Sequence, residues 1–382
     1  MGETNVTITI PQSRLDRGFE KHKDEYEAAA LRVLRSGWYI LGKEVEEFEK
    51  EFAAYVGVPH AIGVGNGLDA LYLAFRALEI GEGDEVIVQG NTYIASVMGI
   101  TMNGATPVFA EPDEYHLIDP EEVRRKITDK TKAVLVVHLY GQASRMDEIV
   151  AICKEHNLKL VEDCAQSHGA YFGDTMTGAF GDIGCFSFYP SKNMGAFGDA
   201  GACTTSDPAL AQKLKVLRNY GSEKRYHNMV VGVNSRLDEM QAALLRARLM
   251  HMEEMTAERC AIAARYDAGI TNPHVIKPSR CTGATHVFHQ YILQIPKKDA
   301  GAKENPRDAF QEFLADRGVG TIIHYPIPPH RSKAYAYLGM GEGSLPLTER
   351  LADEVVSLPM FTGMTTKEQQ QVIDAVNAWD GV

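Results

Sequence analysis

The sequence predicts an α/β fold in which a large domain holds a mostly parallel central sheet sandwiched by helices, followed by a smaller C-terminal α+β domain. Short apolar runs alternate with helical segments between about residues 44 and 205, which is typical of parallel strands joined by helical crossovers. The interiors of these runs are almost wholly apolar, as strands covered on both faces require. After about residue 206 the pattern becomes helical, and a mixed segment begins near residue 262.

The elements of the large domain follow one another along the chain. Val45, Phe48, Phe52 and Val56 recur at helical spacing, and Gly57 supplies a C-terminal stop. The strand HAIGV then leads through a glycine turn into the helical stretch LDALYLAFRALEI. The further predicted strands are DEVIVQ, TPVFA, KAVLVVH and LKLVE.

The second half of the chain is predicted in the same way. We expect a long helix from roughly residue 236 to 258, a strand at VFHQYILQ, a helix at PRDAFQEFLADRG and a terminal helix near 366–379. The polar stretch KKDAGAKENPRD predicts a solvated surface loop. We place the large domain, with an N-terminal helical segment, at residues 1–260 and the small domain at 261–382.

Composition excludes several classes of function. A chain of 382 residues with 45% apolar and 24% charged residues fits a soluble protein of one large and one small domain. The net charge of -12 argues against a nucleic-acid partner, because phosphate-backbone binding needs concentrated Lys and Arg. The chain has no apolar run long enough for a membrane span and no secretory signal at MGETNVTITI. The six scattered cysteines favour reduced thiols in a cytoplasmic protein. We expect no metal site.

A glycine turn after the first strand is a candidate phosphate site. In Gly65-Asn66-Gly67-Leu68-Asp69, glycines let the backbone approach an anion, and the N–H groups at a helix start can hold phosphate. The same residues would also make an ordinary strand-to-helix turn. A dinucleotide fingerprint is disfavoured, because Leu68 stands where that motif needs its last glycine. A nicotinamide-dependent dehydrogenase is therefore a poor alternative.

Side chains suited to a pyridine ring follow two of the strands. Asp163 lies at the end of an apolar strand, where it could hold the proton of a pyridine nitrogen or simply cap a helix. Ala165 is small enough to pack against a ring face, and Gln166 can reach a phenolic oxygen. Tyr93, in Asn-Thr-Tyr, could stack on the ring or belong to the core.

Lys192 is the candidate reactive amine. It follows the apolar segment FSFYPS and precedes the glycine-rich GAFGDAG, a context that disfavours an ordinary surface lysine. Burial lowers the pKa of a lysine and favours the free amine that forms Schiff bases. Ser187, in the same segment, could add a hydroxyl to a phosphate site. A single cofactor would explain all four features.

Together these segments resemble the DegT/DnrJ/StrS family of sugar aminotransferases, which are fold type I enzymes that depend on pyridoxal 5'-phosphate. The resemblance covers nearly the whole chain, through SGWYILGKEVEEFE, GNGLDAL, EDCAQSHGA, FSFYPSKNMGAFGDAG, GVNSRLDEMQAA and IHYPIPPH. It implies that Lys192 carries the cofactor as a Schiff base and that Asp163 contacts the pyridine nitrogen. Gln166 matches the residue at the ring hydroxyl. The remaining cofactor contacts that it implies are Tyr93, Ala165, Ser187 and the backbone of Gly67 and Leu68.

The resemblance also implies a homodimer whose active sites are shared across the interface. Asn234, in GVNSR, matches an asparagine that reaches the phosphate from the second subunit. His324, Tyr325 and Arg236 match residues near the sugar, and L-glutamate is the implied amino donor. Two further candidates for the substrate mouth rest on the residues alone: the loop SEKRYH, with Arg225 and Tyr226, and Tyr39 in SGWYILG. A surface loop and a packing tyrosine are their alternatives.

The substrate is also predicted from the resemblance. The segments HLYGQ, at residues 138–142, and KRYHNMVVGVNSRLDE are closest to members that act at C-3 of a nucleotide-linked keto-sugar. This implies amination of a dTDP-linked 3-keto-6-deoxyhexose in deoxyaminosugar and glycan biosynthesis. The alternatives are a UDP-linked sugar aminated at C-3 and a 4-keto-6-deoxyhexose aminated at C-4. A sugar dehydratase of this fold is disfavoured because such relatives replace the lysine with histidine. A regulator of this fold would need a DNA-binding extension.

Overall fold

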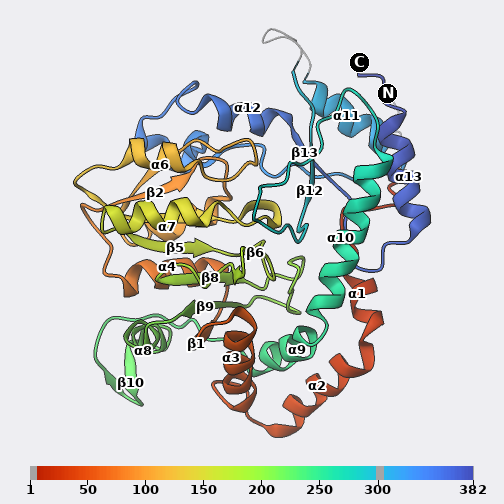
Figure 1. The fold of residues 1–382 in the computed structure, drawn as a ribbon. Helices are drawn as coiled ribbons and strands as arrows, with labels where there is room; N and C mark the ends of the chain where they lie inside the picture. Colours follow the sequence, from red (N-terminus) through yellow and green to blue (C-terminus); the bar gives the residue numbers. More distant parts are fainter. Residues whose placement is uncertain (1–6, 298–304, 382) are drawn as a thin grey trace.

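A seven-stranded sheet forms the centre of the computed structural model, which describes residues 7–297 and 305–381. The strand order is β1-β9-β8-β5-β4-β2-β3, and helices cover both faces (Figure 1). β9 is antiparallel to both of its neighbours, and every other neighbouring pair is parallel. The predicted α/β class with a mostly parallel sheet is therefore confirmed. The strands are β1 (His60–Val64), β2 (Glu85–Gln89), β3 (Thr106–Ala110), β4 (Thr131–Val137), β5 (Lys159–Asp163), β8 (Ile183–Ser187) and β9 (Gly201–Thr205).

The apolar runs predicted as strands are β1 to β5, but β9 gave no such signal. Its sequence, GACTT, is buried throughout but lacks large apolar residues. A Cβ atom at Gly201 would lie 2.5 Å from the backbone carbon of Asn66. The strand therefore has no room for a side chain at Gly201, and its hydrophobicity alone does not reveal it.

Helices α3 to α9 pack around this sheet. α3 ends at Gly57, whose φ of 86° is the left-handed conformation that favours glycine. The predicted helix from 236 to 258 is instead two helices, α9 and α10, because the chain leaves helical geometry at His251. The helices are α3 (Lys43–Val56), α4 (Gly67–Ala77), α5 (Ile94–Thr101), α6 (Pro120–Lys126), α7 (Met146–Glu155), α8 (Pro208–Leu217) and α9 (Glu239–Leu249).

The C-terminal part is a small α+β layer. Its strands β12 (Tyr291–Gln294) and β13 (Val355–Leu358) are antiparallel, and α11 (Pro306–Ala315), α12 (Pro346–Glu354) and α13 (Thr366–Asn377) surround them. Only the second half of VFHQYILQ is a strand, because residues 287–290 bond to the turn after β4 instead. Of the predicted loop KKDAGAKENPRD, residues 298–304 lie outside the described part, and Pro306 already begins α11.

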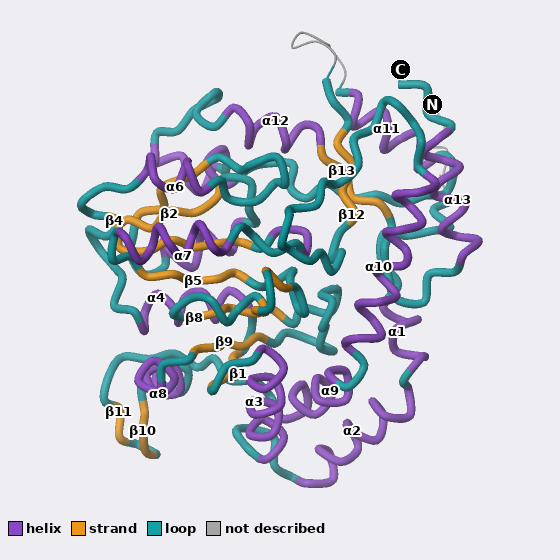
Figure 2. Tube along the Cα trace, in the orientation of Figure 1, coloured by secondary structure: helices purple, strands orange, loops and turns teal. Residues whose placement is uncertain are grey.

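α10 (Met252–Gly269) connects the two parts and runs along their common side (Figure 2). Met252 and Met255 pack in the core beneath α3, whereas Ile262 and Tyr266 pack in the core around β12 and β13. The predicted boundary at 260/261 thus falls inside one helix, and the division into domains stays a prediction. The N-terminal helices are α1 (Leu15–Lys21) and α2 (Lys23–Ser36). Among the described residues, no helix is long and apolar enough to cross a membrane.

Candidate active site

A cavity of about 510 Å³ lies at the carboxyl ends of β2, β4, β5 and β8. This edge of a parallel sheet is where α/β proteins bind their ligands, and the volume suits a small molecule. Both parts of the chain contribute to its walls. The predicted residues that line it are Gly67, Leu68, Tyr93, Asp163, Ala165, Gln166, Ser187, Lys192, His324 and Tyr325.

Asp163 is buried at the end of β5, and two protein donors hold its carboxylate. The Ser96 hydroxyl donates to Oδ2 at 2.7 Å, and the Ala165 N–H donates to Oδ1 at 3.1 Å. Thr92 donates in turn to Ser96 at 2.7 Å, because the Ser96 hydroxyl has only one proton. Burial raises the pKa of Asp163, while these donors and Lys192 oppose the rise. A buried carboxylate with unused acceptor positions favours a cationic ligand, such as a protonated pyridine.

Lys192 lies on the loop between β8 and β9, and α9 holds this loop in place. The Lys192 N–H donates to the carbonyl of Tyr189 at 2.8 Å, which makes a tight turn. Arg248 donates to the carbonyl of Gly195, and the Phe197 N–H donates to the side chain of Gln241 on α9. Burial lowers the pKa of Lys192 to about 8, although Asp163 opposes this shift. Lys192 is therefore a free amine at neutral pH far more often than a lysine with the ordinary pKa.

The start of α4 forms an anion cradle. Asn66 caps this helix by accepting from the Asp69 N–H at 2.8 Å, so the preceding N–H groups of Gly67 and Leu68 are left for a ligand. The cradle is narrow, because a Cβ atom at Gly67 would lie 2.5 Å from Cβ of Ser187. Ser187 thereby brings its hydroxyl beside the helix start. These groups fit a phosphate.

Gln166 and the two tyrosines form the remaining wall. The side-chain oxygen of Gln166 accepts from the Tyr140 N–H, so its NH2 group is directed toward the Tyr325 hydroxyl at 3.1 Å. In this orientation the Gln166 NH2 group can also donate to the phenolic oxygen of a ligand in the cavity. The rings of Tyr93 and Tyr325 lie 5.1 Å apart, and Tyr93 is 54% exposed, which leaves a face available for stacking. Asp163, Lys192, the anion cradle and this wall together fit a phosphorylated pyridine aldehyde.

Five predicted site residues lie outside the lining of this cavity: Tyr39, Arg225, Tyr226, Asn234 and Arg236. Arg225 and Tyr226 lie on an exposed hairpin, β10 (Ser222–Lys224) and β11 (His227–Asn228), which projects beside α8 (Figure 1). Asn234 is exposed, Arg236 donates to the side chain of Asn219 at 3.2 Å, and Tyr39 is 52% exposed. Within one chain, these residues are not part of the same site as Lys192.

Sequence reasoning missed several residues of the cavity. Thr92, two residues before α5, and Ser96, in its first turn, are the hydroxyl pair behind Asp163. Their spacing of four residues after the end of β2 was an available signal. His289 also lines the cavity, and its Nδ1 donates to the Asn193 side-chain oxygen at 3.1 Å. The Asn193 amide nitrogen donates to the carbonyl of Val287, which fixes this polarity. No sequence signal pointed to His289, because tertiary packing brings it to Lys192.

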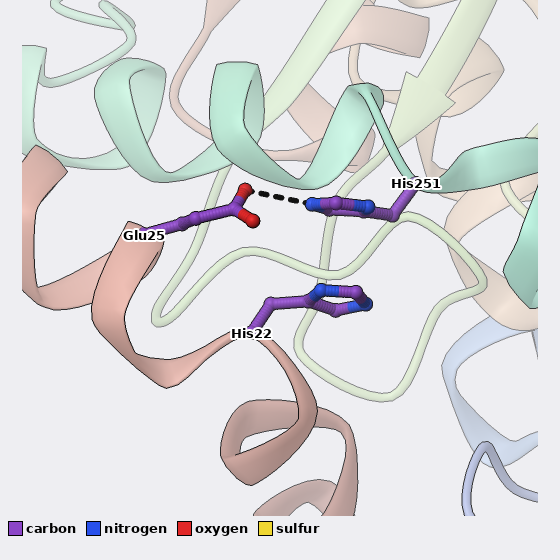
Figure 3. A group of neighbouring side chains, drawn as sticks. All are labelled: His22, Glu25 and His251. Atoms are coloured by element: carbon purple, nitrogen blue, oxygen red, sulfur yellow. Dashed lines mark hydrogen bonds and ion pairs between the residues drawn. The ribbon is translucent and has the colours of Figure 1, made fainter.

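A second group of titratable side chains lies away from the cavity, between α2 and α10 (Figure 3). His22 and His251 stack face to face with ring centroids 3.6 Å apart and an interplanar angle of 14°. Glu25 lies 2.7 Å from Nε2 of His251. Because imidazole lone pairs lie in the ring plane, two parallel stacked rings direct them side by side rather than toward one ion. The arrangement is that of a helix-packing contact.

The family model described as "DegT/DnrJ/EryC1/StrS aminotransferase family" matches residues 20–377 of this chain. A dTDP-3-amino-3,6-dideoxy-alpha-D-galactopyranose transaminase from Aneurinibacillus thermoaerophilus is 49% identical, over 94% of this chain and 96% of the relative. A dTDP-3-amino-3,4,6-trideoxy-alpha-D-glucose transaminase from Streptomyces venezuelae is 45% identical, over 99% of this chain and 98% of the relative.

A solved structure agrees with these relatives. The crystal structure of S. venezuelae DesV in complex with a ketimine intermediate superposes with a TM-score of 0.92 at 45% identity, covering 97% of this chain and 98% of that one. Enzymes of this family depend on pyridoxal phosphate, in agreement with the predicted cofactor.

Proposed function

We propose that this chain, which belongs to the DegT/DnrJ/EryC1/StrS aminotransferase family, transfers an amino group from L-glutamate to C-3 of a dTDP-linked 3-keto-6-deoxyhexose. The product is a dTDP-linked 3-amino-3,6-dideoxy sugar. The observation that carries the reaction type is the placement of Lys192 and Asp163 in one cavity at the carboxyl end of the sheet. The substrate is supported by the 49% identity to a transaminase named for such a sugar.

Five residues of the cavity have a part in this reaction. Pyridoxal phosphate bound in this cavity would supply an electron sink and a carrier for the amino group. Asp163 would accept a hydrogen bond from the ring nitrogen and keep it protonated. Lys192 Nζ takes the proton from the α-carbon of the amino donor and later delivers a proton to C-3 of the sugar. Gly67, Leu68 and Ser187 would hold the phosphate and so keep the cofactor beside Lys192.

The proposal includes a homodimer in which a second copy completes the site. A nucleotide diphosphate brings negative charge, yet Lys192 is the sole lysine or arginine among the described residues that line the cavity. The exposed hairpin carries Lys224 and Arg225, and the nearby Arg236 adds a further cation. We assign these cations, with Asn234 and Tyr39, to the cavity of the partner. We also assign the protein to the cytoplasm. All six cysteines are free, as is usual in that reducing compartment.

Subunit exchange tests the shared site. Lys192→Ala and Asn234→Asp subunits, each of which we expect to be inactive alone, are mixed under conditions that allow exchange. Hybrid dimers then contain one site with both native residues, so part of the activity returns. No recovery after exchange, with dimers seen by sedimentation, would contradict the sharing of residues. Monomers in sedimentation would contradict the dimer itself.

The substrate is tested by product identification. The protein, loaded with pyridoxal phosphate, is incubated with L-glutamate and a panel of 3-keto and 4-keto 6-deoxyhexoses linked to dTDP or UDP. We expect the dTDP-linked 3-keto sugar to be converted fastest, with the new amine at C-3 in the NMR spectrum. Amination at C-4, or a preference for UDP, would replace this substrate with the corresponding alternative.

The role of Lys192 is tested separately by chemical trapping. Borohydride reduces and fixes the bond between the cofactor and the lysine that holds it, and peptide mapping then locates the label. We expect the label on Lys192 alone, and none in a Lys192→Ala variant. Lys213→Ala, which removes an exposed lysine paired with Glu79, is the matched control and should label normally.

A further inference from the structure

Tyr140 connects three separate segments that line the active-site cavity. It lies in the turn Leu139–Gly141 directly after β4 and is buried. Its hydroxyl donates to the carbonyl of His324 at 2.6 Å, and its N–H donates to the side chain of Gln166. Its carbonyl accepts from the Gln290 N–H at 3.1 Å. All its polar groups are therefore used, each by a different part of the cavity wall.

The backbone of Tyr140 is held in an unfavourable conformation. Its φ of 62° and ψ of -2° lie in the left-handed region, which costs a residue with a side chain roughly 1–2 kcal/mol. Glycine would adopt this conformation without that cost, and the chain does place one at the next position. Gly141 has a φ of 103°, and a Cβ atom there would lie 2.8 Å from the backbone nitrogen of His289. The tyrosine side chain makes the hydrogen bond to His324, which glycine at this position could not make.

Its contacts set the relative positions of two groups in the cavity. The Tyr140 N–H occupies the side-chain oxygen of Gln166 and so directs the Gln166 NH2 group toward Tyr325. The Tyr140 hydroxyl donates to the carbonyl of His324, the residue that precedes Tyr325. One residue of the turn after β4 thereby fixes both sides of the contact between Gln166 and Tyr325.

We propose that Tyr140 is a positioning residue that aligns the His324–Tyr325 segment with the cofactor pocket for the sugar half of the reaction. This inference rests on the proposed function, because it assigns the His324–Tyr325 wall to the keto-sugar. The amino donor reacts beside Lys192 and Asp163, neither of which Tyr140 contacts through its hydroxyl. Loss of the hydroxyl releases the carbonyl of His324, so the wall moves and the keto-sugar is held less well over the reacting carbon.

The test measures the two half-reactions of the holoenzyme separately in Tyr140→Phe. Cofactor absorbance follows the first half-reaction with L-glutamate and the second with the keto-sugar. Removing one partner of a buried hydrogen bond should lower kcat/KM of the sugar half-reaction about tenfold or more. The donor half-reaction should stay within twofold of wild type. Sugar binding, titrated by the same absorbance, should weaken in parallel.

Tyr266→Phe is the matched control, because the Tyr266 hydroxyl is buried and donates to a backbone carbonyl, that of Pro359, at 2.8 Å. It lies outside the cavity, so both of its half-reactions should remain unchanged while its melting temperature reports the cost of losing such a bond. Equal losses in both half-reactions of Tyr140→Phe, or no loss in either, would overturn the positioning role. If the wild-type protein aminates a different keto-sugar, the proposed substrate is wrong. The loss of kcat/KM in each half-reaction of Tyr140→Phe, measured with that sugar, still decides the role of Tyr140.

Discussion

Glu162 and Asp163 are consecutive carboxylates at the end of the same strand, yet they face opposite sides of the sheet and meet different surroundings. Glu162 accepts from the N–H groups of Gly178, Phe180 and Gly181 at 2.7 to 2.8 Å, and from Nε2 of His138 at 3.1 Å. These four donors use the capacity of the carboxylate in full. Asp163 has two protein donors and opens onto the cavity.

The difference shows that burial of a charge does not by itself mark a functional site. Glu162 is 0% exposed and Asp163 is 5% exposed, so their accessibility hardly distinguishes them. What distinguishes them is how far the protein itself satisfies each carboxylate. Glu162 ties the loop after β7 (Thr175–Met176) to the sheet, whereas Asp163 keeps acceptor positions for a ligand. Isosteric amide substitutions should therefore have opposite consequences on the two faces.

Asp163→Asn should produce the largest change in activity. The amide cannot hold a proton on the ring nitrogen, and turnover should fall about 10³-fold, the scale of losing one preorganised electrostatic group. Because burial raises the pKa of Asp163, the fold disfavours its ionised form, and the cofactor-free variant should unfold at the same or a higher temperature. Asp129→Asn, on an exposed turn, is the control. A large drop in melting temperature would show that Asp163 is structural, as Glu162 is.

Glu162→Gln should affect stability first. The side-chain NH2 would face N–H donors that now have no acceptor, and breaking such a buried charged network costs about 3–5 kcal/mol. The measurement is the free energy of unfolding in urea. Glu148→Gln is the matched control, since its carboxylate is 45% exposed and pairs with Arg145 at 3.3 Å. An exposed pair of that kind is worth about 1 kcal/mol or less. Equal free energies of unfolding for the two variants would contradict a structural role for Glu162.

Ser96→Ala should have an intermediate effect on the Asp163 side. A hydrogen bond to a charged group contributes about 1.5–3 kcal/mol, so turnover should fall about 10- to 100-fold. Thr92→Val removes only the second link of the chain, from Thr92 to Ser96, and should lower turnover less. Steady-state rates with both substrates saturating give the comparison. A greater loss in Thr92→Val than in Ser96→Ala would contradict transmission through the Ser96 hydroxyl.

The smallest expected effect concerns the pH dependence of Lys192. Its neutral amine reacts with the cofactor, so the rate of covalent capture by the cofactor-free protein should rise with pH and level off above about 8. Asp163 raises the pKa of Lys192, so Asp163→Asn should move the plateau to lower pH. Glu162→Gln, assayed where it is folded, should leave the plateau in place. Stopped-flow absorbance measures these rates, and an identical shift in both variants would contradict a specific pairing of Lys192 with Asp163.

The strands and the reacting groups were predictable because their signals are local. The apolar runs of β1 to β5 and the contexts of Lys192 and Asp163 each lie within a few consecutive residues. The roles of Tyr140 and His289 were not predictable, because contacts from distant segments create them. The break at His251 was also missed, because the apolar periodicity of the sequence continues across it while the backbone leaves helical geometry. The spacing of apolar residues indicates a helix, but it does not show where the backbone breaks between two helices.

α10 also has a consequence for cutting and rejoining the chain. A break after residue 260 would leave each fragment with half of a helix whose two ends belong to different cores. Arg259, beside the break, donates through Nη1 to the carbonyls of Phe288, His289 and Met360, so the first fragment would lose all three acceptors. We therefore expect that neither fragment folds on its own. Reassembly of the two should restore the cofactor absorbance only when they are expressed together, which makes this helix a sensitive site for a split-protein reporter.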